Sequence, residues 1–385
     1  MVREVTRNIK REVERELWAQ AAGRCEFEGC NRLLYKSPIT QERVNISEKA
    51  HIYSFSEEGP RGWGPFRLIP ENLNNIDNLM LMCHDCHKTI DQDKEGTTYS
   101  GSLLRQWKNN HERRIVTVTG ISSDKKTHVV FYASNISEQK SLIQRNDAID
   151  AMFPNRYPAE ERPILLSMSC SHQDKTPQFW QTESIHLKNI FSMKINQQIE
   201  EQTPAHFSIF ALAPMPLLIQ LGTLFTDKID VDVYQPIREP KTWKWQKFPD
   251  GYELIIKEPD TFNNPPALVI SLSDKIKHDR IFDVLGNDVS IWELTAEDSF
   301  IGNDMIRAQA QLSLMRTAIR KLMVLIKEKH GYNTPLSVFP AMAVSSSIEM
   351  GRARMPKVDM PWIIYDQNNE VGKFIETLTI GGNQC

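Results

Sequence analysis

The chain has 385 residues, of which 40% are hydrophobic and 25% charged, and its formal net charge is −3 at pH 7. This length predicts two or three domains. No run of about 18 apolar residues occurs and the start lacks the apolar core of a signal peptide, so no membrane association is expected and a cytoplasmic location is predicted. The net charge says little about partners: if the chain binds DNA, it does so through a local basic patch or through oligomerisation.

The first third of the chain carries helical periodicity at both ends and turn-rich sequence between them. Its predicted elements are, in order, a helix over 6–22 that ends at Gly23, a strand-like segment over 44–55, a Gly/Pro-rich loop over 56–75, and helices over 86–94 and 100–114. Residues 115–134 then change in composition and predict a strand, a turn and a strand. We therefore expect one domain over 1–114 and a second over 115–385.

The second part alternates apolar runs with helical stretches. The predicted buried strands are 163–169, 206–213, 229–235, 267–273, 289–295 and 335–342, and a long helix is predicted over 304–330. Strands that alternate with helices are typical of an α/β domain with a parallel sheet.

Four of the six cysteines form two closely spaced pairs. Cys25 and Cys30 are followed, more than fifty residues later, by Cys83 and Cys86. Two such pairs supply four thiolates to a tetrahedral zinc ion, and such a site is closed to substrate. We therefore interpret the four cysteines as a structural zinc site, with reactive thiols as the alternative, and Cys170 and Cys385 as structural or incidental.

Two histidines and an asparagine stand in a fixed relation to these cysteines. His51 lies in the strand-like segment, Asn78 precedes Cys83 by five residues, and His87 directly follows Cys86. With the cysteines, this pattern resembles the HNH endonuclease family of the ββα-metal type, over about residues 5–114. The resemblance implies that His51 is the general base, that His87 binds a catalytic Mg²⁺ or Mn²⁺ ion, and that Asn78 holds the loop that orients His51. A neutral histidine can take a proton from water, and a hard cation can stabilise the leaving oxygen of a phosphodiester.

The pattern departs from the family at the residue before the base, where many members have another metal ligand and this chain has Ala50. Asp91, one helical turn after His87, is the predicted substitute, and a solvated helix residue is the alternative. Glu48 and His84 are weaker candidates. The loop over 59–67, with Arg61, Trp63 and Arg67, contacts phosphates or is an ordinary surface loop.

The second part resembles a SAVED domain, the two-lobed, Rossmann-like (CARF-like) sensor of cyclic oligonucleotides in bacterial anti-phage CBASS systems. The stretches that carry this resemblance are 210–245, 267–273 and 336–366. It implies that a cyclic di- or trinucleotide binds this domain, that protomers then assemble into a homo-oligomer, and that the HNH domains degrade double-stranded DNA.

Open α/β sheets bind ligands at the carboxyl ends of their strands. This rule places the loops after the predicted strands at the ligand, with arginines for phosphates and tryptophans for bases. The candidates are Pro214, Met215, Trp243, Trp245, Ser273, Lys275, Ser346, Arg352 and Arg354.

The sequence thus predicts a zinc-stapled α+β HNH domain followed by an α/β sensor of two lobes. Two different functions stay open beside the ligand-gated nuclease. One is a restriction-type HNH nuclease whose second domain recognises modified DNA, and the other is an inactive, zinc-stapled DNA-binding protein.

Overall fold

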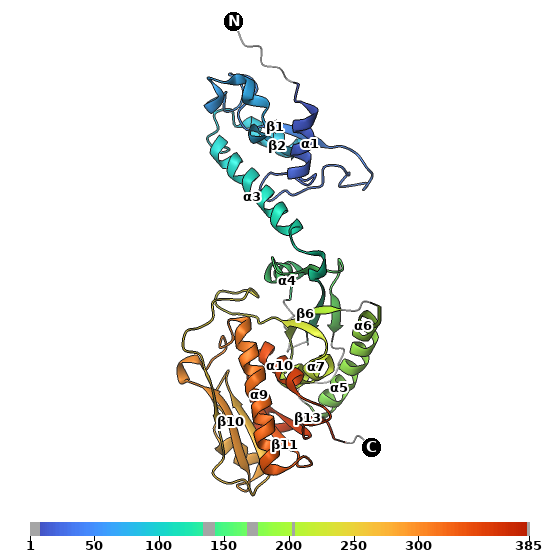
Figure 1. The fold of residues 1–385 in the computed structure, drawn as a ribbon, viewed down its shortest axis with the longest axis vertical. Coiled ribbons are helices and arrows are strands. Elements are labelled where there is room, and N and C mark those ends of the chain that lie inside the picture. The colour runs from blue at the N-terminus through green and yellow to red at the C-terminus, as the bar shows by residue number, and fades with distance from the viewer. Residues whose placement is uncertain (1–7, 134–142, 168–175, 202–204, 383–385) are drawn as a thin grey trace. The chain divides into compact units, whose positions relative to one another are not determined.

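A computed structural model describes residues 8–133, 143–167, 176–201 and 205–382 (Figure 1). The chain divides into two compact units, residues 1–122 and 123–385. The predicted boundary after residue 114 falls within a helix of the first unit. Cys170, Cys385 and the ends of some predicted elements (6–7, 134 and 168–169) lie outside the described residues. Within the described ranges, no helix has the length and apolar character needed to cross a membrane.

The first unit is built on a short antiparallel hairpin, in which β1 (Ser47–His51) pairs with β2 (Leu79–Cys83). Every residue of β2 is buried. The helices of the unit are α1 (Arg11–Gln20), α2 (His84–Gln92) and α3 (Gly101–Thr119), and the 3₁₀ turns are η1 (Gly64–Phe66), η2 (Pro70–Asn74) and η3 (Ile76–Asn78). Its small core includes Leu17, Leu81 and Leu104, together with Met82 and Cys83 at the end of β2.

The helix α3 corrects one prediction. Residues 115–119, predicted as strand from the change in composition, continue the helix, and the Gly120 N–H donates to the Val116 carbonyl 2.9 Å away. Strand propensity is largely a matter of packing on a sheet. No strand in the described residues pairs with this segment, so the helix that begins after Ser100 extends through it.

The second unit begins with a parallel sheet in the order β4-β3-β6-β7, with β5 also paired to β3. Its strands are β3 (Lys126–Ala133), β4 (Tyr157–Pro158), β5 (Ile164–Ser167), β6 (His206–Leu212) and β7 (Asp230–Val233). Its helices are α4 (Arg145–Met152), α5 (Pro177–Phe191), α6 (Gln197–Glu201) and α7 (Met215–Phe225).

A second sheet follows in the order β13-β12-β11-β9-β10-β8, parallel in its middle and antiparallel at both edges. Its strands are β8 (Leu254–Lys257), β9 (Pro266–Ser271), β10 (Ser290–Ala296), β11 (Leu336–Ala341), β12 (Trp362–Asn368) and β13 (Lys373–Ile380). Its helices are α8 (Asp279–Leu285), α9 (Gln309–His330) and α10 (Val344–Ala353). The predicted α/β class with parallel sheets is confirmed, whereas a Rossmann-like form of each lobe stays a prediction.

The two sheets of the second unit share one hydrophobic core, and α7 from the first lobe crosses α10 from the second within it. The crossing is made by two glycines. A Cβ added to Gly222 would lie 2.0 Å from the Ile348 carbonyl oxygen, and one added to Gly351 would lie 2.0 Å from that of Ile219. The two helix backbones are therefore in direct contact in the C-terminal half of each helix.

Candidate functional site

The four paired cysteines converge in the first unit. The sulfur atoms of Cys25, Cys30, Cys83 and Cys86 all lie within 4.8 Å of one another, and no other group of three or more potential metal-ligating side chains occurs among the described residues. The Cys83 N–H donates to the Cys25 sulfur at 3.4 Å. Burial raises the pKa of Cys25 to about 12, so a thiolate there requires a neighbouring cation. The donor set and its spacing are compatible with a zinc site.

His51 is the last residue of β1, and its ring is largely enclosed. Its Nε2 atom lies 2.9 Å from Oδ1 of Asn74, a partner that the sequence did not reveal. Burial lowers the pKa of His51, and the nearby His87 lowers it further, against the opposing effects of Asn74 and Asp91. The imidazole is therefore neutral at pH 7, the form in which a histidine can accept a proton.

Asn78 is fully buried and joins the segment after His51 to the turn η2. Its side-chain amide donates to the carbonyls of Tyr53 and Leu73, each at 2.9 Å, and its Oδ1 accepts from the Tyr53 N–H at 2.9 Å. Its own carbonyl accepts from the Ile52 N–H at 2.8 Å. Together these contacts fix the backbone directly after His51.

His87 and Asp91 face each other on α2, with Nε2 and Oδ2 3.2 Å apart. The other carboxylate oxygen of Asp91 lies 3.2 Å from Arg61 Nη2, and the Arg61 side chain is only 3% exposed. Burial raises the pKa of Asp91, but the hydrogen bond from His87 and the charge of Arg61 outweigh it and lower the pKa overall. Asp91 is therefore a carboxylate at neutral pH.

Arg61 is not a surface residue of the loop over 59–67. Its guanidinium donates to the carbonyls of Ile52 at 2.5 Å and Ile90 at 2.7 Å, which ties this loop to β1 and α2. Arg67 instead pairs with Glu57 on the surface. Glu48 and His84, the weaker candidates for a metal ligand, contact each other at 3.4 Å rather than His87 or Asp91.

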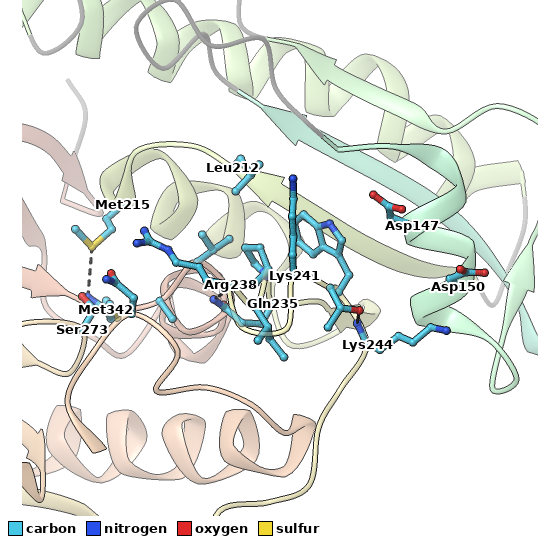
Figure 2. A pocket seen from close by; sticks show the side chains of 17 residues that line it. Asp147, Asp150, Leu212, Met215, Gln235, Arg238, Lys241, Lys244, Ser273 and Met342 are labelled. Atoms are coloured by element: carbon cyan, nitrogen blue, oxygen red, sulfur yellow. Dashed lines mark hydrogen bonds between the residues drawn. The ribbon is translucent and has the colours of Figure 1, made fainter. Parts of the chain in front are cut away.

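The second unit contains a cavity of about 950 Å³ (Figure 2). It lies where β6, β7, β9 and β11 end, as Leu212, Gln235, Ser273 and Met342 in its wall show. Its rim includes the first residues of α7 and α10, and the Met342 N–H donates to the Met215 sulfur at 3.4 Å across this rim. The cavity therefore stands at the carboxyl ends of parallel strands and at the positive ends of two helices.

Charged side chains of both signs line this cavity. The loop after β7 contributes Arg238, Lys241 and Lys244, and α4 contributes Asp147 and Asp150 (Figure 2). These three basic residues were not among the ligand residues predicted from the sequence, although their loop, "REPKTWKW", is basic and directly follows a predicted strand.

The predicted ligand residues divide between this cavity and other places. Met215, Trp243 and Ser273 line it. Four others do not appear in its wall: Pro214 caps α7, Trp245 stacks with Tyr234, Lys275 pairs with Asp298, and the Ser346 hydroxyl donates a hydrogen bond to the Ala343 carbonyl.

The two arginines predicted to bind phosphates need a correction. Arg352 is 6% exposed and its guanidinium pairs with Glu349 at 2.8 Å and bonds the carbonyls of Thr226 and Ile229. Arg354 is 6% exposed and lies over the ring of Trp362. The Arg352 guanidinium is thus held by the end of α10 and the segment after α7, and that of Arg354 by the residues around Trp362, so in this structure both groups contact protein atoms and neither lines the cavity.

Comparisons with known proteins agree with the two-unit division. A family model for HNH endonuclease matches residues 25–94, and one for the "SMODS-associated and fused to various effectors sensor domain" (SAVED) matches residues 187–380. No curated protein matches the chain.

Solved structures similar to the chain include the Acinetobacter baumannii Cap4 SAVED/CARF-domain containing receptor with the cyclic trinucleotide 2'3'3'-cAAA. It is 13% identical with a TM-score of 0.42, and the match covers 81% of this chain and 67% of that one. The same receptor with 3'3'3'-cAAA is 13% identical with a TM-score of 0.42, covering 77% of this chain and 65% of that one. The Moraxella osloensis Cap4 receptor is 12% identical with a TM-score of 0.36, covering 81% and 69%.

The sensor model spans half of the chain, and the nuclease model spans the hairpin, the cysteines and α2. The chain belongs to the SAVED family and carries an HNH endonuclease domain ahead of its sensor domain.

Proposed function

We propose that this protein is a metal-dependent endonuclease that degrades double-stranded DNA when a cyclic oligonucleotide binds its SAVED domain, as an effector of bacterial anti-phage (CBASS) defence. The observation that carries the proposal is that a nuclease-family unit and a sensor-family unit occur in one chain, each with its own polar site. The proposal does not depend on whether the domains divide at residue 114 or at residue 122, because the residues of the nuclease site precede both positions and those of the cavity follow both.

In the nuclease unit, His51 takes the proton from the attacking water. Its ring is neutral because burial lowers its pKa, and Asn74 fixes its orientation through Nε2. Nδ1 is then the atom that accepts the proton. Asn78 keeps the following backbone in place and acts as a positioning residue.

His87 and Asp91 would hold the catalytic Mg²⁺ or Mn²⁺ ion. Adjacent ligands of one octahedral ion lie about 3 Å apart when each bond is about 2.1 Å long, and His87 Nε2 and Asp91 Oδ2 are 3.2 Å apart. An ion bound there would replace the proton that His87 donates to Asp91, because a ligating imidazole nitrogen is deprotonated. Arg61 holds the other oxygen of Asp91 and so sets the direction of the carboxylate. Such an ion would neutralise the charge that develops on the leaving oxygen.

The four cysteines would hold a structural zinc ion. The core of this unit is small, and four sulfur ligands join the segment near Cys25 to the junction of β2 and α2 at Cys83 and Cys86. Zinc binding in such a site contributes directly to the free energy of folding.

In the sensor unit, the cavity at the strand ends suits a ligand with several phosphates. Its volume of about 950 Å³ is at the upper end of the range for small-molecule sites. Arg238, Lys241 and Lys244 supply positive charge for phosphates, and Asp147 and Asp150 can accept hydrogen bonds from amino groups of bases. The two Cap4 structures named with cyclic trinucleotides are consistent with a ligand of this class.

Activation would follow from assembly. A ligand that binds the assembled state more tightly than the free protomer drives assembly by that difference in affinity alone. Each chain has a net charge of −3, so one chain alone attracts DNA weakly. Oligomerisation would also bring the local basic patches of several chains together.

The test is a plasmid-degradation assay with Mg²⁺ or Mn²⁺ and a panel of cyclic di- and trinucleotides, with the His51→Ala chain as control. We expect the wild-type chain to cleave the plasmid only when one of the ligands is present, and we expect the His51→Ala chain not to cleave it. Ligand-independent cleavage would overturn the sensor part of the proposal. Absence of cleavage with every ligand, while the protein binds one of them, would overturn the nuclease part.

A further inference from the structure

The third helix of the nuclease unit presents a polar stripe that has no role in the site described above. Ser102, Arg105, Gln106, Asn109, Asn110 and Arg113 recur at intervals of three and four, so they share one face of α3. Together with Tyr53 they line a groove of about 400 Å³ that contains two arginines and no acidic side chain. In a chain with a net charge of −3, such a groove is a local concentration of positive charge.

These side chains are available for a partner. Gln106, Asn109, Asn110 and Arg113 are exposed, and within the described residues the structure gives their side chains no hydrogen-bond or carboxylate partner. The opposite face of α3 is buried instead, and there Lys108 is neutralised by Glu112 at 2.5 Å. The helix thus pairs its inward cation and leaves its outward cations unpaired.

Arg105 is held in place by aromatic rings. Its guanidinium carbon lies 5.3 Å from the centre of the Tyr53 ring and 5.8 Å from that of Phe66, and its Nε atom is buried and unpaired. Burying an unpaired donor costs free energy unless a ligand satisfies it. Stacking fixes the plane of the guanidinium, which favours an acceptor with two oxygens, such as a phosphate.

The groove is joined to the nuclease site through Tyr53, two residues after His51. The Tyr53 ring fits against two glycines: a Cβ on Gly64 would lie 2.2 Å from it and one on Gly101 2.4 Å from it. Its backbone is held by Asn78 on both sides. The platform under Arg105 and the backbone after His51 are therefore one rigid piece.

We propose that this stripe on α3 is a binding track for the phosphate backbone of the DNA duplex and positions the substrate at the nuclease site. Arg105 and Arg113 are eight residues apart, about 12 Å along the helix axis. That distance corresponds to three to four phosphates of one strand, counted along B-DNA at about 3.4 Å each. The amides between them donate to phosphate or sugar oxygens. The inference rests on the proposed nuclease function and adds the surface that binds its substrate.

The test uses the full-length His51→Ala chain, which leaves the probe intact, and a fluorescein-labelled DNA duplex of about 30 base pairs, near three helical turns. Binding is measured by fluorescence anisotropy between about 50 and 200 mM salt. Adding Arg113→Ala should weaken binding and lower the magnitude of the slope of log K against log salt by about 0.9. The ratio of the affinities with and without this substitution should therefore change about 3.5-fold over this range of salt. Arg15→Ala, an exposed arginine of α1 in the same unit, is the matched control and should change neither.

Arg105→Lys complements this variant, because it keeps the charge and loses the planar stack. It should retain the salt slope and weaken binding at every salt concentration. Unchanged affinity and slope for Arg113→Ala, or equal losses for Arg15→Ala, would overturn the track while DNA cleavage by the wild type upholds the nuclease function. Tighter binding of an RNA duplex than of the DNA duplex would overturn the assignment to DNA, and absence of both DNA binding and cleavage would remove the nuclease function itself.

Discussion

Replacing Asn78 by alanine tests the link between the buried amide and the candidate base. The substitution removes three side-chain hydrogen bonds of 2.9 Å and leaves the Tyr53 N–H and the carbonyls of Tyr53 and Leu73 without this partner inside the protein. At about 1 kcal/mol for each bond, the hairpin region loses about 3 kcal/mol of local stability. Its opening equilibrium constant should therefore rise about 100-fold.

Amide hydrogen exchange followed by mass spectrometry measures this effect in the nuclease unit alone. Peptides over residues 47–55 and 73–83 should exchange about 100-fold faster in Asn78→Ala, whereas peptides of the sensor unit should be unchanged. DNA cleavage should also fall, because the backbone that follows His51 loses its fixed position. Asn75→Ala is the matched control, since Asn75 is exposed and its side chain makes no cap hydrogen bond.

Equal exchange rates for Asn78→Ala and Asn75→Ala in both peptides would show that the Asn78 hydrogen bonds do not stabilise the hairpin region. Fast exchange with full cleavage would refute only the positioning role of Asn78, because the unit would then tolerate an open backbone next to His51.

Four further outcomes are expected. Metal analysis of the purified chain should give about one zinc per protomer, and Cys25→Ser should lose it and unfold the nuclease unit while the circular dichroism of the sensor unit persists. Gly222→Ala should lower the melting temperature of the sensor unit by roughly 5–10 °C in calorimetry, because the added Cβ forces α7 away from α10 at a cost of up to about 3 kcal/mol. Burial, together with the charge of Arg156, lowers the pKa of His206 to about 4. Because this folded-state pKa lies below the unfolded value of about 6.5, stability present at pH 7 is lost as the pH falls from about 6.5 towards 4, by about 2 kcal/mol at pH 5, and melting curves of His206→Gln should lack this loss. The pH profile of kcat/KM for cleavage should stay level at pH 7 and decline only below about 6.5, since the pKa of His51 is lowered by burial.

The cysteine cluster could be predicted because its information is local in the sequence. Two cysteine pairs with spacings of five and three residues can bind one ion only if the two chain segments that carry them lie side by side. The structure brings the four sulfur atoms together. His87 follows Cys86 directly and Asp91 lies one helical turn further, so their common face on α2 also followed from the sequence.

Arg61 could not be assigned in the same way. Its burial depends on carbonyl groups from the segment after β1 and from α2 and on the carboxylate of Asp91, which come together only in the folded unit. An arginine in a Gly/Pro-rich loop resembles any surface residue until those acceptors are placed.

The cavity of the second unit shows the same limit. The rule of strand ends points to Met215 and Ser273, and both line the cavity because the order of strands along the chain is readable from the sequence. Arg352 and Arg354 do not line the cavity because they are buried against segments outside α10, Arg352 against the end of α7 and Arg354 against Trp362, and the sequence of one helix does not show what will cover it.

The glycine crossing between α7 and α10 has an evolutionary consequence. When a substitution enlarges a side chain on one helix of a packed pair, a smaller side chain on the other helix usually compensates for it. Gly222 and Gly351 instead face backbone atoms, which no substitution can make smaller. The ordinary route of compensating substitutions is closed at this point. Among homologues, both positions should stay glycine together, and a lineage that loses one should also show changed lengths in the segments that set the spacing between the two helices.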